Sequence, residues 1–143
     1  MKFNFLGRVI SVEADGGGSI VTSQSFPQGE DYLESPFHPP SQVPATLILE
    51  SMAASGGRLV RAVSGEKAFG LVVRVEEARF WSSVKAGEEV LVRSELLGIQ
   101  DKSGESFGLA RTRSQAFVGD EAVAEARIAF ICVPVAGFGL KPA

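Results

Sequence analysis

Apolar and polar residues alternate over much of the chain, and this period of two predicts β-strands. The first such run covers Phe3–Glu13, and the pattern resumes over Ile20–Phe26 after the segment ADGGGS. Glycine supplies the positive φ angles that tight turns require. ADGGGS therefore predicts the turn of a β-hairpin that joins these two strands.

Four more strand-like runs follow in the second half of the chain, at residues 69–81, 88–99, 107–118 and 121–133. The last two runs place small or apolar side chains on one face and charged side chains on the other. This arrangement predicts packing against the first face and solvent on the second. The connections AGE, DKSGES and GDE are short, which predicts that consecutive strands of this group are antiparallel neighbours.

A different pattern, apolar on nearly every face, covers Ala45–Val63 and predicts a buried helix. The preceding segment, Pro27–Pro44, holds five of the seven prolines and predicts a loop, because proline cannot donate a backbone hydrogen bond. Pro44 itself suits the first helical position, where an N–H would be unpaired anyway. We therefore expect an α+β fold: a six-stranded antiparallel sheet with a polar outer face, wrapped around one central helix.

The 143 residues suit one domain spanning residues 1–143, with residues 136–143 expected to be a frayed tail. The net charge of −3 argues against nucleic-acid binding, and no segment approaches the ~20 apolar residues of a membrane-spanning helix. A single cysteine, Cys132, excludes an internal disulfide, and a single histidine, His38, leaves no cluster for zinc. We expect a cytoplasmic protein with no metal site, no cofactor, and neither nucleic acid nor membrane as a partner.

Glu50 is the only formally charged residue between Glu34 and Arg58, in the middle of the apolar helix. Removing a carboxylate from water is costly, and two interpretations stay open. In one, Glu50 faces a polar neighbour, water or a subunit boundary. In the other, it is a general acid or base. His38, twelve positions earlier, is either a surface residue of the loop or a partner for Glu50.

Much of the chain resembles the β-hydroxyacyl-acyl-carrier-protein dehydratases (FabZ/FabA-like), which have the hotdog fold. The family pattern reads Gly-His-Phe-Pro-x-x-Pro-x-x-Pro-Gly-x-Leu-x-x-Glu, followed later by Ala-Arg-Phe and Val-x-Pro-Gly-Asp. The matching segments are SPFHPPSQVPATLILESMAASGG, FGLVVRVEEARFWSSVKAGEEVLVRSELL and GDEAVAEARIAF. Pro44, Leu47 and Glu50 match in register, as do Ala78-Arg79-Phe80 and Gly87.

The resemblance implies dehydration of a β-hydroxyacyl thioester, in which a loop histidine and a helix carboxylate carry out the acid–base steps. Glu50 falls on the helix carboxylate. The catalytic histidine position falls on Pro36, which has no acid–base capacity, and His38 is the candidate replacement two residues later.

The resemblance also implies a substrate-binding site at the start of the helix, where a backbone N–H binds the thioester oxygen. Ala45 occupies the position of the family's glycine and is the expected oxyanion donor. Pro44, Phe37 and Phe80 are the further expected substrate contacts.

Three functions stay open. The first is a dehydratase or hydratase of fatty-acid or related biosynthesis in which His38 has taken over as the base. The second is a thioesterase or isomerase in which Glu50 acts alone. The third is a non-catalytic hotdog protein that binds acyl chains or supports a partner subunit.

The expected partners are an acyl thioester carried on acyl carrier protein and a second copy of the chain. A homo-oligomer, at least a dimer, is expected because hotdog proteins pair through their sheets. Five arginines are candidates to attract an acidic carrier protein: Arg58, Arg61, Arg79, Arg111 and Arg113.

Overall fold

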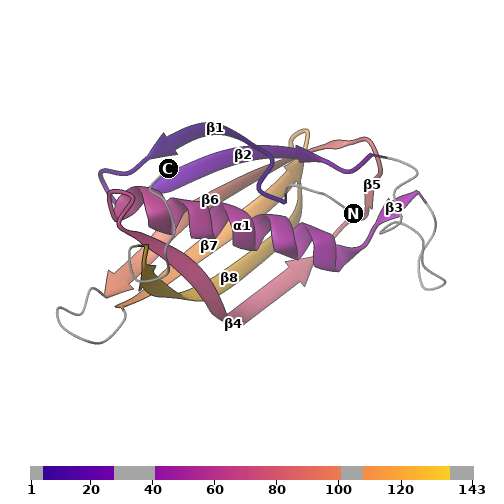
Figure 1. The fold of residues 1–143 in the computed structure, drawn as a ribbon. Helices are drawn as coiled ribbons and strands as arrows, with labels where there is room; N and C mark the ends of the chain where they lie inside the picture. Colours follow the sequence, from indigo (N-terminus) through magenta and orange to yellow (C-terminus); the bar gives the residue numbers. More distant parts are fainter. Residues whose placement is uncertain (1–4, 28–40, 101–107, 136–143) are drawn as a thin grey trace.

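The structure is a computed structural model that describes residues 5–27, 41–100 and 108–135. Within these ranges a single helix lies along the inner face of a curved sheet (Figure 1). In chain order the elements are β1 (Arg8–Glu13), β2 (Ser19–Ser25), β3 (Gln42–Val43), α1 (Ala45–Val63), β4 (Ala68–Phe80), β5 (Val84–Lys85), β6 (Glu89–Gln100), β7 (Gly108–Val118) and β8 (Glu121–Pro134). No helix of the described ranges is long and apolar enough to cross a membrane.

Six strands form one antiparallel sheet in the order β1-β2-β6-β7-β8-β4, while β3 and β5 form a separate two-stranded sheet. The expected α+β architecture, a six-stranded sheet wrapped around one helix, is confirmed (Figure 1). The predicted hairpin is also confirmed: β1 pairs with β2, and Gly16, Gly17 and Gly18 between them all have positive φ.

The position of β4 corrects one expectation. The short AGE connection predicted that the strand after the helix would neighbour the next long strand, β6. Instead β4 pairs with β8 at the far edge of the sheet. The chain after β4 does not turn back as a hairpin, because Val84–Lys85 form β5 and pair with β3. This connection passes the N-terminal end of α1 before it enters β6 (Figure 1).

Helix α1 covers the residues that its apolar pattern predicted. Pro44 is the N-cap rather than the first helical residue, because its ψ of 140° is not helical. Its carbonyl oxygen accepts a hydrogen bond from the Leu47 N–H at 3.0 Å. The buried face of the helix is Ile48, Ser51, Met52, Ser55, Gly56, Leu59 and Val60.

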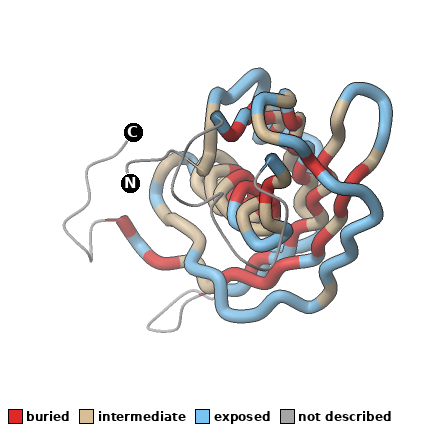
Figure 2. The backbone as a smooth tube through the Cα atoms, turned by 90° about the vertical axis from the view of Figure 1, so that its right-hand side faces the viewer, coloured by how far each residue is buried: buried red, intermediate tan, exposed pale blue. Residues whose placement is uncertain are grey.

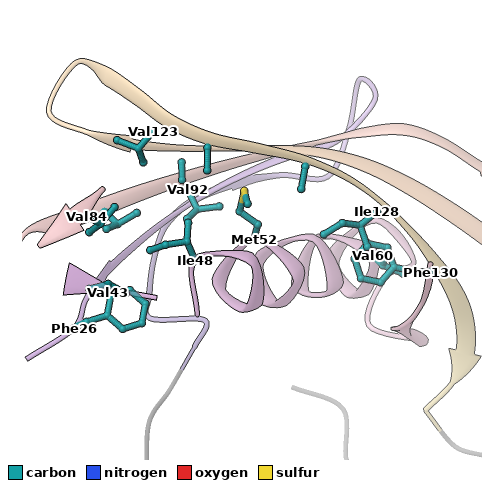
Figure 3. Packing of buried hydrophobic residues seen from close by; sticks show 14 of the residues in the cluster. Phe26, Val43, Ile48, Met52, Val60, Val84, Val92, Val123, Ile128 and Phe130 are labelled. Atoms are coloured by element: carbon teal, nitrogen blue, oxygen red, sulfur yellow. The ribbon is translucent and has the colours of Figure 1, made fainter. Parts of the chain in front are cut away.

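The core fills the space between α1 and the sheet (Figure 3). Buried residues occur on α1 and on the strands, whereas the turns that join β1 to β2 and β7 to β8 are mostly exposed (Figure 2). Six hydroxyl residues of the described ranges are at most 1% exposed: Thr22, Ser51, Ser55, Ser94, Thr112 and Ser114. The hydroxyls of Ser94 and Ser114 are hydrogen-bonded at 2.6 Å across β6 and β7.

Strand β4 corrects a second expectation, because alternation predicted Leu71, Val73 and Val75 on one shared side. Two β-bulges, at 72–74 and 75–77, shift the register against β8. All three side chains are 40–49% exposed. Since β4 is also an edge strand, the sheet ends in an apolar border that no other described strand covers. The outer face of the sheet is therefore less polar than expected.

Candidate active site

The N-terminus of α1 is open to a ligand among the described residues. No side chain of these residues caps the helix, and its first turn contains no acidic residue. The first backbone N–H groups of a helix have no acceptor within the helix and carry the positive end of its dipole. The N–H groups of Ala45 and Thr46 therefore form a place where a partially negative oxygen is stabilised.

A hollow of about 240 Å³ lies beside this helix end. Its lining residues come from three segments that are far apart in the chain: Gln42, Val43, Ala45, Ile48, Phe80, Trp81, Ser82, Ser83, Val84, Val123 and Ala124. The side chains of Val43, Ile48, Val84 and Val123 gather around the start of the helix (Figure 3). Two residues expected to bind substrate, Ala45 and Phe80, are thus brought together. Pro44 immediately precedes Ala45 without itself lining the hollow.

Phe80 reaches the hollow because it is the last residue of β4, in register with Ala124 of β8. Its side chain is 41% exposed, and that of the adjacent Trp81 is 52% exposed. The backbone N–H of Trp81 donates to the carbonyl oxygen of Val123 at 2.8 Å and fixes the chain there. Two large aromatic side chains thus border the hollow and remain accessible to an apolar ligand.

Glu50 lies on α1 between the buried Ile48 and Met52 and is itself exposed. It does not line the hollow beside Ala45 and Phe80. In the single chain, Glu50 therefore faces water. This agrees with the first of the two interpretations that the sequence left open, in which Glu50 faces a polar neighbour, water or a subunit boundary. The role of Glu50 as an acid or base stays a prediction.

Three expected positions, Pro36, Phe37 and His38, lie outside the described residues. The structure therefore brings Ala45 and Phe80 together, leaves Glu50 on the open side of the same helix, and does not test the contact between His38 and Glu50.

Three polar residues of the hollow were not predicted: Gln42, Ser82 and Ser83. Ser82 donates its hydroxyl to Glu121 at 2.7 Å, and the Gln42 side-chain amide donates to the Ser83 hydroxyl. Gln42 and Ser83 meet because β3 pairs with β5, two strands of only two residues each. Strands this short leave no periodic pattern in the sequence, so only their place within the matched segments offered a signal.

A larger hollow, about 830 Å³, lies on the opposite face of the sheet. Its walls include Leu97, Ile99 and Leu109, together with the ion pair in which Arg111 meets Glu76 at 3.3 Å. It lies away from the helix N-terminus, and none of the residues expected to bind or convert substrate lines it. The smaller hollow is the better candidate because backbone donors and exposed aromatic rings converge there.

The profile of the FabA-like domain family matches residues 1–127. The chain belongs to this family. The predicted resemblance is therefore confirmed over most of the sequence.

Two relatives of this FabA-like chain are named 3-hydroxyacyl-acyl-carrier-protein dehydratase FabZ. The protein from Chlamydia trachomatis serovar L2 is 29% identical over 118 residues, which cover 80% of this chain and 73% of that protein. The protein from Protochlamydia amoebophila is 28% identical over 131 residues, which cover 92% and 80%.

Solved structures with the same fold include two thioesterases. One from Haemophilus influenzae has a TM-score of 0.65 at 10% identity, covering 87% of this chain and 78% of that one. A mutant thioesterase from Pseudomonas aeruginosa has a TM-score of 0.62 at 14% identity, covering 86% and 80%. These likenesses establish the hotdog fold and nothing about the reaction.

The arginines predicted to attract a carrier protein all have carboxylate partners in the FabA-like fold. Arg58 and Arg61 both bind Glu66, at 3.2 and 2.8 Å. The other pairs are Arg79–Glu77, Arg111–Glu76, Arg113–Glu95 and Arg113–Glu125. Their charge is largely neutralised locally, so carrier binding through these five residues stays a prediction.

No group of three or more His, Cys, Asp or Glu side chains suited to a metal ion occurs within residues 5–27, 41–100 and 108–135. The site combines backbone donors at a helix end, a hollow with aromatic and aliphatic walls, three neutral polar side chains and a carboxylate five residues along the helix.

Proposed function

We propose that this FabA-like chain is a β-hydroxyacyl thioester dehydratase that acts on acyl chains held by acyl carrier protein. The observation that carries the proposal is the open N-terminus of α1 beside Phe80 and the hollow of about 240 Å³, with Glu50 on the same helix. The FabZ relatives bear the name of this reaction and align over most of the chain.

The proposed reaction removes one molecule of water. A base takes the proton from the α-carbon, and the electron pair of that C–H bond forms the α–β double bond. The bond between the β-carbon and its hydroxyl breaks, and an acid supplies a proton so that the hydroxyl leaves as water. We assign these proton transfers to Glu50 and His38, because carboxylate and imidazole side chains can hold and release protons near neutral pH.

Negative charge develops on the thioester oxygen while the α-proton is being removed. The N–H groups of Ala45 and Thr46 lie at the positive end of α1, where hydrogen bonds and the helix dipole both stabilise such charge. The acyl chain then extends past Phe80 over the floor made by Ile48, Val123 and Ala124. This arrangement assigns binding to the backbone and the apolar walls, and leaves the acid–base work to side chains.

The proposed active form is a dimer joined along β4. This edge strand is thirteen residues long, and Leu71, Val72, Val73 and Val75 are 40–49% exposed on it. A second copy pairing its own β4 antiparallel to the first would cover these side chains and satisfy the free backbone groups. Such a partner is also the source we propose for the histidine that faces the exposed Glu50 carboxylate.

We further propose that residues 1–143 form one domain and that the protein works in the cytoplasm without a metal or cofactor. His38 replaces the base that Pro36 cannot supply, and Phe37 contacts the acyl chain.

Product analysis tests the proposed reaction. The protein is incubated with 3-hydroxybutyryl-acyl-carrier protein, and the products are identified by mass spectrometry. We expect a crotonyl thioester that has lost water. Release of free 3-hydroxybutyrate and carrier thiol would instead identify a thioesterase, and an unchanged substrate would indicate a non-catalytic protein; either result contradicts the proposal.

A further inference from the structure

Gln42 and Ser83 form a polar pair beside the helix N-terminus. The strands that hold them, β3 and β5, lie side by side just beyond the start of α1 (Figure 1). Backbone contacts hold the two segments together, since Gln42 is in register with Lys85 and the Ala86 N–H donates to the Ser41 carbonyl at 2.8 Å. The side-chain amide of Gln42 donates a hydrogen bond to the hydroxyl of Ser83. The pair is therefore held in place by its backbone.

The hydrogen-bond capacity of this pair is only partly used among the described residues. The Ser83 oxygen accepts from Gln42, so the proton of that hydroxyl is left to donate. Gln42 retains a second amide N–H and its carbonyl oxygen. Ser83 is exposed and Gln42 is half-buried, so a ligand in the hollow can reach both. The neighbouring Ser82 differs, because its hydroxyl is already donated to Glu121.

The walls around this pair are otherwise apolar or aromatic. Of the side chains that line the hollow, those with hydrogen-bonding oxygen or amide groups are Gln42, Ser82 and Ser83. A ligand with one oxygen close to the Ala45 N–H and a second oxygen along its chain would find its second partner here. A β-hydroxyacyl thioester has this arrangement, because its hydroxyl is two carbons from the carbonyl.

We propose that Ser83, oriented by Gln42, binds the β-oxygen of the acyl chain and makes the site selective for β-hydroxyacyl over unsubstituted acyl thioesters. The inference rests on the proposed function, because it places the thioester oxygen on the α1 N-terminus. Ser83 donates its hydroxyl proton to the substrate hydroxyl, and Gln42 is the positioning residue behind it.

The test compares the affinities of 3-hydroxybutyryl-coenzyme A and butyryl-coenzyme A by calorimetry. All proteins carry Glu50→Gln, so that the bound hydroxyacyl group is not consumed. We expect Ser83→Ala to lower the preference for the hydroxylated ligand about fivefold, since one hydrogen bond contributes about 1 kcal/mol and a tenfold change corresponds to about 1.4 kcal/mol. Ser83→Thr keeps a hydroxyl and should retain the preference, and Gln42→Leu should lose part of it.

The matched control is Ser82→Ala, which removes a hydroxyl from the same hollow that is already committed to Glu121. Its preference should equal that of the parent. An unchanged preference in Ser83→Ala overturns the inference, and so does an equal loss of affinity for both ligands, which would mean that the pair only holds β3 to β5. If the inference is wrong but the protein with Glu50 intact still produces crotonyl thioester, the proposed function stands.

Discussion

Gly56 lies against the ring of Phe130, and a methyl group at Gly56 would stand 2.9 Å from the Cζ atom of that ring. The same methyl group would stand 2.9 Å from the hydroxyl oxygen of Thr112. Phe130 is fully buried, and a methyl group at Gly70 would be 3.0 Å from its Cδ1 atom. Two glycines, one on α1 and one on β4, therefore make the space in which this core ring lies.

Gly56→Ala should destabilise the protein. Overpacking a core costs about 1–3 kcal/mol, whereas replacing a helical glycine by alanine contributes about 1 kcal/mol in the opposite direction. We therefore expect the free energy of unfolding to fall by about 1 kcal/mol and by no more than about 2 kcal/mol, because the packing term is the larger one. Urea unfolding followed by circular dichroism measures this change.

Gly57→Ala is the matched control on the same helix. The nearest atom to its new methyl group is the carbonyl oxygen of Gly70 at 3.6 Å, an ordinary contact. The helix-propensity gain of up to about 1 kcal/mol then acts alone, and the free energy of unfolding should rise. If both variants change stability in the same direction, the packing account of Gly56 is wrong.

Arg113 joins three strands on the outer face of the sheet. Its guanidinium contacts Glu95 on β6 at 3.2 Å and Glu125 on β8 at 2.6 Å. Hydrogen bonds to Glu95 and Glu125 raise the pKa of Arg113 above its ordinary value. A raised pKa stabilises the fold at every pH below the ordinary value, and this contribution is lost only when the pH rises through the folded-state pKa. Over the usual pH range, the contribution of Arg113 to stability therefore depends on salt concentration rather than on pH.

Arg113→Met should lower the free energy of unfolding by about 0.5–1 kcal/mol at low salt, a modest effect because the side chain is partly exposed. The loss should shrink in 1 M NaCl, where charges are screened beyond about 3 Å. Arg93→Met is the control, since Arg93 is exposed on β6 and has no ion pair with any described carboxylate. An Arg113 effect that does not change with salt would show that packing, not charge, stabilises this position.

The exposed border of β4 predicts a dimer. Light scattering should give twice the chain mass of 15.1 kDa. Charges at Leu71 and Val75 should prevent the pairing, because lysines on an edge strand oppose strand addition. We expect the double variant Leu71→Lys, Val75→Lys to be a folded monomer.

The opposite edge of the sheet provides the control for this experiment. Ile10 on β1 is 48% exposed, much like the β4 residues, yet it lies on the other edge strand. Ile10→Lys should leave the dimer intact. A parent protein that is monomeric, or a double variant that remains dimeric, would contradict pairing through β4.

The parts of the fold that the sequence predicted are those with a local pattern. Helix α1 begins and ends where the apolar run does, and Ala110, Thr112 and Ala116 on β7 are buried as their alternation indicated. A local pattern does not indicate which strand pairs with β4, because a strand's neighbours depend on the path of the connecting chain. The bulges in β4 also break the period of two on which the side assignment rested.

In the candidate site, too, the sequence predicted the residues at motif positions but not the contacts that depend on tertiary structure. Ala45 and Phe80 were expected from motif positions, and the fold brings them to one hollow. Glu50 was expected in the helix, but its exposure follows from which face of α1 packs against the sheet. Gln42 and Ser83 are 41 positions apart, and only the β3–β5 pairing joins them. Contacts of this kind depend on tertiary structure and have no signature in the local sequence.

The hydration of crotonyl thioester by the parent and by Glu50→Gln tests the central claim most directly. The amide keeps the shape of the carboxylate but cannot take or give a proton, so kcat should fall by about 10²–10⁴-fold. Glu13→Gln, at an exposed carboxylate of β1, should retain the parent rate. A Glu50→Gln protein that hydrates crotonyl thioester as fast as the parent would contradict the assignment of Glu50 as the acid–base residue of a dehydratase.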